Sequence, residues 1–365
     1  MTTLSARKLN RATLDRQLLL RRHPLTAQEA VRRLAGLQGQ APLAPYVGLW
    51  CRLAGFEPGE LSDLIDRRVV VRAPAMRGTV HVLDAEDLIA FRSLFGPLLA
   101  GVLETNFRKN LGAAAQAELA AHSARLLAGQ SLSRAAIGRA LAPRWPDAGP
   151  MALAYAATYL VPVVQVPPRG IWGKSAQATF AEAEAWLGRP LAATGPDAAG
   201  RLVLRYLAAF GPATVADAAT WSGLTRLREV TDRLELRRLR GPDGAELLDL
   251  PDIALPDEDT PAPPRFLPEY DNLLLSHADR RRVIPHDRRP PLWPGNGASQ
   301  GTLLIDGSWD ALWKITGKGG SAGLAVTPFG ALTATEETAV AEEGARLLAF
   351  TAPGQAPDIR FLPPV

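Results

Sequence analysis

The sequence contains almost no cysteine and few histidines. Cys51 is the only cysteine among 365 residues, which excludes an intramolecular disulfide framework and any zinc site built from several cysteines. The five histidines are scattered along the chain without the spacing of metal ligands. We therefore expect a protein that needs neither a metal ion nor an organic cofactor.

Long apolar runs and the common catalytic motifs are missing too. No stretch reaches the roughly 18 to 20 consecutive apolar residues that cross a bilayer, and residues 1–20 carry arginines where a signal peptide has its apolar run. We expect a cytoplasmic protein that does not contact membranes. The sequence has no Walker loop, dinucleotide fingerprint or nucleophile elbow, so the enzyme classes that carry these motifs have no support.

Lysine is also scarce, with 5 lysines against 36 arginines and a formal net charge of +4. Arginine suits bidentate contacts with phosphate, and arginines gather near the N-terminus, at 226–240 and at 280–289. A GC-rich genome would produce the same bias, because it favours arginine codons. The charge is therefore compatible with a nucleic-acid partner without establishing one.

The N-terminal pattern is one of helices followed by a short hairpin. Helices are predicted over 5–20 and 60–68, and a capping box at Thr26 starts another helix between them. Two short strands follow at 69–72 and 76–83, separated by a proline-containing turn. Helices followed by an antiparallel pair predict a winged helix-turn-helix.

The same pattern returns twice, with low sequence identity between the copies. The second copy has predicted helices at 131–141 and 151–160 and strands at 163–166 and 171–174. The third has helices at 202–210 and 225–239, with an N-cap signal at Thr214 and a wing at 241–250. The copies share the order of their predicted helices and strands, and three such copies favour a tandem array.

An acidic, proline-rich linker at 251–264 marks a change of architecture. Beyond it, short apolar runs alternate with glycine and proline turns, which predicts a β-barrel-like domain with one helix at 335–350. The fold class is therefore α+β, with tandem winged helix-turn-helix repeats and a C-terminal β-barrel-like domain. The expected domains are a first part (1–83), a second part (84–190), a third part (191–255) and a C-terminal part (265–365).

Gln38 and Gln40 are the most unusual polar feature, because they flank Gly39 where the helix of the first part is expected to end. A break at Gly39 would let both amides turn to one side. Neutral amides suit the release of a purine that is alkylated at N7 or N3, because the cationic base leaves without a general acid. Paired amides can then hold the attacking water. The alternative is that the two glutamines only cap a helix end in solvent.

Four segments together resemble the winged-helix DNA glycosylase family of AlkZ and YcaQ. They run in the family's order and span nearly the whole chain. The segments are Leu-Gln-Gly-Gln-Ala-Pro (37–42), Met-Arg-Gly-Thr-Val-His (76–81), Thr-Trp-Ser-Gly-Leu (220–224) and Leu-Pro-Glu-Tyr-Asp-Asn-Leu-Leu (267–274). The family's catalytic motif is Gln, an aliphatic residue, then Gln or Asp. Gln38 and Gln40 match both ends, as in the AlkZ branch, whereas Gly39 departs from the aliphatic middle position.

The resemblance implies a monofunctional DNA glycosylase that removes N-alkylated purines from double-stranded DNA. Its lesions would be N7-alkylguanine, bulky adducts or interstrand crosslinks, and its role DNA repair or self-resistance to a genotoxin. We expect it to act as a monomer, with Gln38 and Gln40 as the catalytic residues. The competing hypothesis is a winged-helix transcription regulator without catalysis, which would need twofold symmetry to bind paired half-sites.

Candidate DNA contacts lie on the predicted hairpins. Arg77 and His81 belong to the first wing, where His81 contacts a phosphate, lines the lesion pocket or is a structural histidine. The second hairpin carries Arg169, Trp172 and Lys174, which suit phosphate contact and base stacking, although a tryptophan on a strand is often a core residue. The remaining candidates, Lys314 and Lys318, flank a glycine-rich tip that resembles in position a DNA-probing hairpin of the family, or is a flexible turn.

Overall fold

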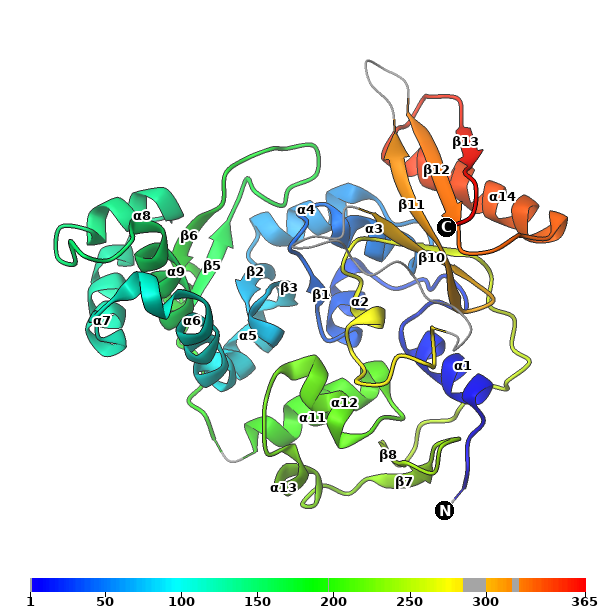
Figure 1. Cartoon of the computed structure of the whole chain (residues 1–365), viewed down its shortest axis with the longest axis horizontal. Coiled ribbons are helices and arrows are strands. Elements are labelled where there is room, and N and C mark those ends of the chain that lie inside the picture. Colours follow the sequence, from blue (N-terminus) through cyan, green and yellow to red (C-terminus); the bar gives the residue numbers. More distant parts are fainter. Residues whose placement is uncertain (1, 196, 285–299, 317–321) are drawn as a thin grey trace.

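The computed structural model describes residues 2–195, 197–284, 300–316 and 322–365. Helices and antiparallel sheets form a mixed α+β fold, as predicted. In Figure 1 the second part forms the left-hand end, the third part lies below the first, and the C-terminal sheet lies at the upper right.

The first part begins with helices that its sequence signals predict. Thr26 and Glu29 form the expected capping box, and the apolar side of the helix that follows, with Ala30 and Val31, is buried. Its elements are α1 (Ala6–Arg16), α2 (Ala27–Arg33), β1 (Leu37–Gln38), α3 (Ala44–Trp50), α4 (Pro58–Asp66), β2 (Val70–Pro74) and β3 (Val80–Asp84).

The second part joins the first through a shared sheet. Arg72 of β2 pairs with Gln165 of β5, so the strands form one six-stranded sheet in the order β1-β3-β2-β5-β6-β4 rather than two separate wings. The elements of the second part are α5 (Ala85–Phe91), α6 (Gly96–Leu111), α7 (Gln116–Leu127), β4 (Leu132–Ser133), α8 (Arg134–Leu141), α9 (Pro150–Leu160), β5 (Val163–Val166), β6 (Thr179–Glu182) and α10 (Ala183–Leu187).

The strand predicted at 171–174 is wrong. The partner of β5 is β6, and residues 167–178 form a connecting loop. Pro167 and Pro168 cannot donate to a ladder, and Ile171 is buried in the core of the first part and the C-terminal part instead.

The third part consists of three helices and a short hairpin. The helix predicted at 225–239 is also wrong, because α13 ends at Thr231 and Arg237–Arg240 is a strand. The reason is burial, since Leu239 faces Leu4, Leu9 and Leu247 in a small core that only an extended strand can reach. The elements are α11 (Ala198–Phe210), α12 (Val215–Ser222), α13 (Leu227–Thr231), β7 (Arg237–Arg240) and β8 (Glu246–Asp249).

The C-terminal strands form an open sheet rather than the predicted barrel. Among the described residues, its order is β13-β12-β11-β10-β9, with β13 and β9 at the two edges. Val340, Leu347 and Leu348 of the long C-terminal helix are buried in the core with this sheet. Its elements are β9 (Arg265–Leu267), β10 (Gly301–Ile305), β11 (Ser308–Thr316), β12 (Gly323–Pro328), α14 (Ala334–Thr351) and β13 (Asp358–Phe361).

A continuous helical run, Ala85–Leu111, is long and apolar enough by length and composition to cross a membrane. Charged residues interrupt this run, so it is not a stretch of consecutive apolar residues in the sequence. Within the structure its apolar side chains Leu88, Leu99 and Leu103 belong to two hydrophobic cores. The run therefore contributes to packing between the second and third parts.

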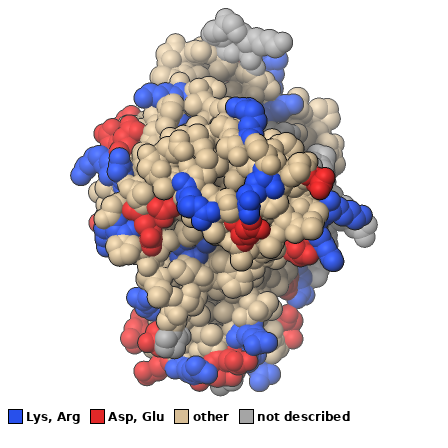
Figure 2. All heavy atoms as spheres, turned by 90° about the vertical axis from the view of Figure 1, so that its left-hand side faces the viewer, with Lys and Arg blue, Asp and Glu red and all other residues tan. Residues whose placement is uncertain are grey.

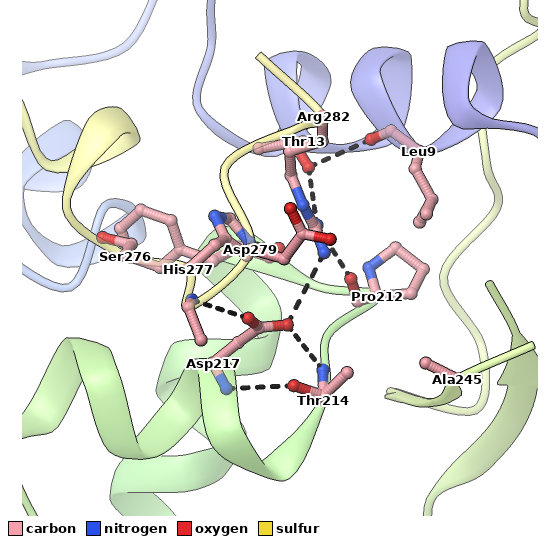
Figure 3. A network of polar contacts seen from close by, with 12 residues as sticks. Leu9, Thr13, Pro212, Thr214, Asp217, Ala245, Ser276, His277, Asp279 and Arg282 are labelled. Atoms are coloured by element: carbon pink, nitrogen blue, oxygen red, sulfur yellow. Dashed lines mark hydrogen bonds and ion pairs between the residues drawn. The ribbon is translucent and has the colours of Figure 1, made fainter. Parts of the chain in front are cut away.

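Buried ion pairs connect segments that are distant in sequence. Arg52 makes two 2.9 Å hydrogen bonds to Asp271, and both side chains are at most 2% exposed. A second buried network, drawn in Figure 3, links the third part to α1. There Asp217 accepts from the backbone of Thr214 and Ala278, and lies 3.6 Å from Arg282. These contacts place residues 271–282 between the first and third parts.

Loss of the Asp271 carboxylate should strongly destabilise the protein. Asp271→Asn leaves the Arg52 guanidinium buried without a counter-charge, which costs about 3–5 kcal/mol in free energy of unfolding. Urea denaturation measures the change. The control is Glu118→Gln, which removes an exposed partner of Arg144 and should cost less than about 1 kcal/mol. Equal costs for the two variants would contradict the prediction.

Candidate functional site

Gln38 lies on a strand, not at the exit of a helix. The helix α2 ends at Arg33 with Leu34 as its C-cap, and the positive φ angles of Ala35 (53°) and Gly36 (92°) turn the chain into β1. There Gln38 pairs with His81 of β3 and is 6% exposed. The alternative hypothesis, in which the glutamines only cap a helix end in solvent, is therefore wrong for Gln38.

Arg77 connects Gln38 to three other segments. Its Nη2 donates to Gln38 Oε1 at 2.7 Å and to Asn272 Oδ1 at 3.0 Å. The same nitrogen lies 3.3 Å from His81 Nε2, and Nη1 donates to the Trp221 carbonyl at 2.9 Å. The first, third and C-terminal parts therefore meet at one guanidinium group.

These contacts fix the orientation of two side chains. An arginine donates and never accepts, so the Gln38 atom facing Arg77 must be the carbonyl oxygen. For the same reason His81 Nε2 is an acceptor, which leaves the proton on Nδ1, 3.1 Å from the Thr79 carbonyl. Burial, together with the charge of Arg77, lowers the pKa of His81 to about 3. His81 is therefore neutral and unsuited to general acid catalysis near neutral pH.

Gln40 lies beside Gln38 but is exposed to solvent. Gln38 Nε2 donates to Gln40 Oε1 at 3.3 Å, so the two amides form one hydrogen-bonded pair. The intervening residue makes the turn possible, since the backbone N–H of Gly39 donates to the Val80 carbonyl. One amide is held within the protein while the other faces solvent.

Arg72 explains why glycine occupies the middle of the motif. Its Nη2 donates to the Gly39 carbonyl at 2.7 Å. A Cβ atom at Gly39 would lie 3.0 Å from Arg72 Nη1 and 3.2 Å from a methyl carbon of Val82. The arginine therefore fills the space that an aliphatic side chain would need.

Both arginines are cations without a carboxylate partner in the described part of the chain. Burial lowers the pKa of Arg72 and that of Arg77 to about 10, and no carboxylate among the described residues offsets this effect. Each remains protonated at neutral pH. The motif is therefore a pair of neutral amides held by two positive charges.

The structure brings only some of the predicted DNA contacts to the surface. His81 is fully buried and therefore not available to DNA. Trp172 is partly buried, and its ring lies tilted against Tyr46 and Phe350, with ring centroids 5.0 and 5.2 Å apart. Arg77 is partly buried and its guanidinium turns inward, as described above.

The other predicted contacts differ in exposure. Lys174 and Lys314 are exposed, whereas Arg169 is partly buried and donates to the Ala176 carbonyl. Lys318 lies outside the described residues. In the described ranges, no group of three or more His, Cys, Asp or Glu is arranged to hold a metal ion.

Two residues of the site were missed by sequence reasoning. Asn272 belongs to a segment that was singled out, but nothing local indicated that its amide would face Arg77. Its Nδ2 donates to the Gly36 carbonyl at 3.2 Å, which holds it against β1. Arg72 was assigned only to a strand, and its place under Gly39 depends on the pairing of β2 with β5.

The ring of His81 should not titrate between pH 5 and 8. Because its folded-state pKa is near 3, against about 6.5 in an unfolded chain, the unfolded state binds the extra proton between these values. The stability contribution is complete above pH 6.5 and is lost as the pH falls toward 3. NMR of imidazole-labelled protein tests this, with His81→Asn for assignment. A His81 titration midpoint near pH 6.5 would contradict it.

Comparison with known proteins identifies the family. The family model of the AlkZ-like DNA glycosylases matches residues 31–350. The DNA glycosylase AlkZ of Streptomyces sahachiroi has a similar fold, with a TM-score of 0.82 over 99% of this chain and 100% of that chain, at 22% identity. No curated protein matches the sequence. The chain therefore belongs to the AlkZ-like family and is a DNA glycosylase, not a transcription regulator.

Proposed function

We propose that this glycosylase hydrolyses the N-glycosidic bond of N-alkylated purines in duplex DNA, with Gln38 and Gln40 as its catalytic residues. One observation carries the proposal, namely that the two amides are hydrogen-bonded to each other in a setting that lacks charged acid–base groups. Among the described residues, no carboxylate or lysine hydrogen-bonds to Gln38, Gln40 or Arg77. Such a site suits a base that leaves without being protonated.

The chemistry of a cationic lesion matches this donor set. In N7-alkylguanine the base carries a positive charge, so the electron pair of the C1′–N9 bond moves to N9 and the base departs neutral. The sugar becomes oxocarbenium-like, and a water oxygen bonds to C1′ while its proton passes to solvent. The protein needs only to hold the water oxygen in position to bond to C1′ of the sugar.

The two amides can divide this task. The oxygen of Gln38 is occupied by Arg77, and its nitrogen donates to Gln40. Gln40 is exposed and keeps its NH₂ group and one oxygen lone pair for a water molecule. Gln40 therefore holds the water, while Gln38 fixes Gln40 and borders the reacting sugar. No lysine nucleophile is proposed, so strand cleavage by a lyase step is not expected.

For the DNA contacts, we propose that the helix–hairpin units of the first, second and third parts are winged helices. On the face shown in Figure 2, basic and acidic residues are interspersed, so that face has no continuous basic surface. We therefore assign DNA contact to the exposed Lys174 and Lys314, to Arg169 in the same loop as Lys174, and to Lys318, which lies outside the described residues. The enzyme would act in the cytoplasm as a monomer.

The lesion class can be tested by incubating purified protein with two DNA duplexes. One carries N7-methylguanine and the other an interstrand crosslink between alkylated purines. Released base and abasic sites should appear, without strand breaks before alkali treatment, and excess EDTA should not reduce the rate. No release from either substrate would overturn the proposed lesion class, and inhibition by EDTA that added zinc or magnesium reverses would reveal a metal requirement.

Truncation of either glutamine should slow base release. Gln38→Ala and Gln40→Ala each remove a hydrogen bond from the unit that holds the water, worth roughly tenfold to several hundredfold in rate. Because cationic lesions depart readily, the lower half of this range is expected. The double variant should resemble the slower single variant, since the two amides act as a unit. Single-turnover kinetics on N7-methylguanine DNA provide the rates.

The matched control is Gln130→Ala, because Gln130 is exposed and only donates to the Leu126 carbonyl within α7 and its C-terminal turn. That variant should excise the lesion at the wild-type rate. Wild-type rates for Gln38→Ala, Gln40→Ala and the double variant would show that the glutamines are not catalytic.

A further inference from the structure

We propose that Arg77 is a positioning residue, which locks the amide of Gln38 in the one orientation that supports Gln40. The inference rests on the proposed function, because it assigns a role within the same site. It replaces the sequence hypothesis that Arg77 contacts DNA.

Burying the charged guanidinium group of Arg77 is energetically unfavourable. Burial disfavours its charged form, and no carboxylate among the described residues compensates for that. All four of its partners are neutral, namely Gln38, His81, Asn272 and the Trp221 carbonyl. Hydrogen bonds from a cation to a neutral oxygen are nonetheless strong. The hydrogen bonds from Arg77 therefore serve to orient these four groups.

The group whose orientation matters is the Gln38 amide. Rotation of the amide by 180° would exchange its oxygen and nitrogen, which are similar in size. The flipped amide would direct its NH₂ at the Arg77 donor and its oxygen at Gln40 Oε1, so donor would face donor and acceptor would face acceptor. Arg77 excludes the flipped orientation, because its Nη2 lies 2.7 Å from the Gln38 amide and can donate only to the amide oxygen.

Arg77 is itself held by distant parts of the chain. Its left-handed backbone (φ 55°) starts a turn with Gly78, where a Cβ atom would lie only 3.1 Å from a methyl carbon of Val102. Its Nη1 reaches the C-terminal end of α12 at Trp221. Asn272 follows directly after the buried Asp271. The orientation of Gln38 is therefore assembled only when the first, third and C-terminal parts are docked.

The central experiment compares Arg77→Met with Arg92→Met. Arg92 is a matched control, because it is buried, has a pKa lowered to about 10 by burial, and donates to the Tyr159 carbonyl outside the site. On N7-methylguanine DNA in single turnover, Arg77→Met should be slower by about 10- to 100-fold, as expected for a misplaced catalytic group. Arg92→Met should retain the wild-type rate, measured at a temperature where both variants are folded.

Binding measurements separate positioning from DNA contact. A positioning residue leaves the Kd for duplex DNA and its salt dependence unchanged. Loss of a phosphate contact would weaken binding and lower the slope of log K against log salt by about 1. An altered slope with an unaltered rate of base release would overturn the proposal in favour of a DNA contact.

Two further readouts exclude a merely structural effect. Gln38→Ala combined with Arg77→Met should be no slower than Gln38→Ala alone, because Arg77 acts through Gln38. Guanidinium ion at low millimolar concentration should partly restore the rate of Arg77→Ala and leave that of Gln38→Ala unchanged. Additive losses, or absence of rescue in a folded Arg77→Ala variant, would contradict the proposal.

Failure of this inference differs from failure of the proposed function. If Gln38→Ala slows base release and Arg77→Met does not, the catalytic glutamines stand and the role of Arg77 is refuted. If Gln38→Ala itself has the wild-type rate, the catalytic assignment is wrong and Arg77 loses the residue through which it would act.

Discussion

The buried ion pair between Arg52 and Asp271 is the constraint on which the arrangement of the site depends. It joins Arg52, two residues after the end of α3, to a segment 219 positions later, in a region where an unpaired charge would be costly. Because Asp271 is fixed, Asn272 is fixed beside it. The remaining partners of Arg77 come from β1, β3 and α12. The way in which the separate parts pack together therefore sets the geometry of the site.

In the part of the chain that the structure describes, the two arginines beside the glutamine motif are hydrogen-bonded to neutral groups and not to carboxylates. Arg72 holds the Gly39 carbonyl and Arg77 holds the Gln38 side chain. A carboxylate near either arginine would offset the cost of burying its charge, yet it would also add a negative charge beside the glutamine motif. The resulting site combines neutral amides with a positive field, which suits a glycosylase whose substrate is a polyanion.

Sequence signals correctly predicted the elements that depend on residues adjacent in the chain. The capping boxes at Thr26 and Thr214 mark true helix starts, and the short strands at 69–72 and 163–166 are present. Errors arose where tertiary burial overrode periodicity. Residues 237–240 form a strand because Leu239 fills a small core, and the C-terminal strands form an open sheet whose inner face is covered by α14.

The sequence by itself determined the pair of glutamines, their separation by a glycine and the absence of a cysteine-based metal site. Those features depend on adjacent residues. Only the tertiary structure decided what surrounds them, because Gln38 and Asn272 lie 39 and 195 positions from Arg77. No periodicity or motif spacing connects residues at such separations. Their contacts follow from how the parts dock. This is why the ring of His81 is buried and the guanidinium of Arg77 turns inward to Gln38, which the sequence did not show.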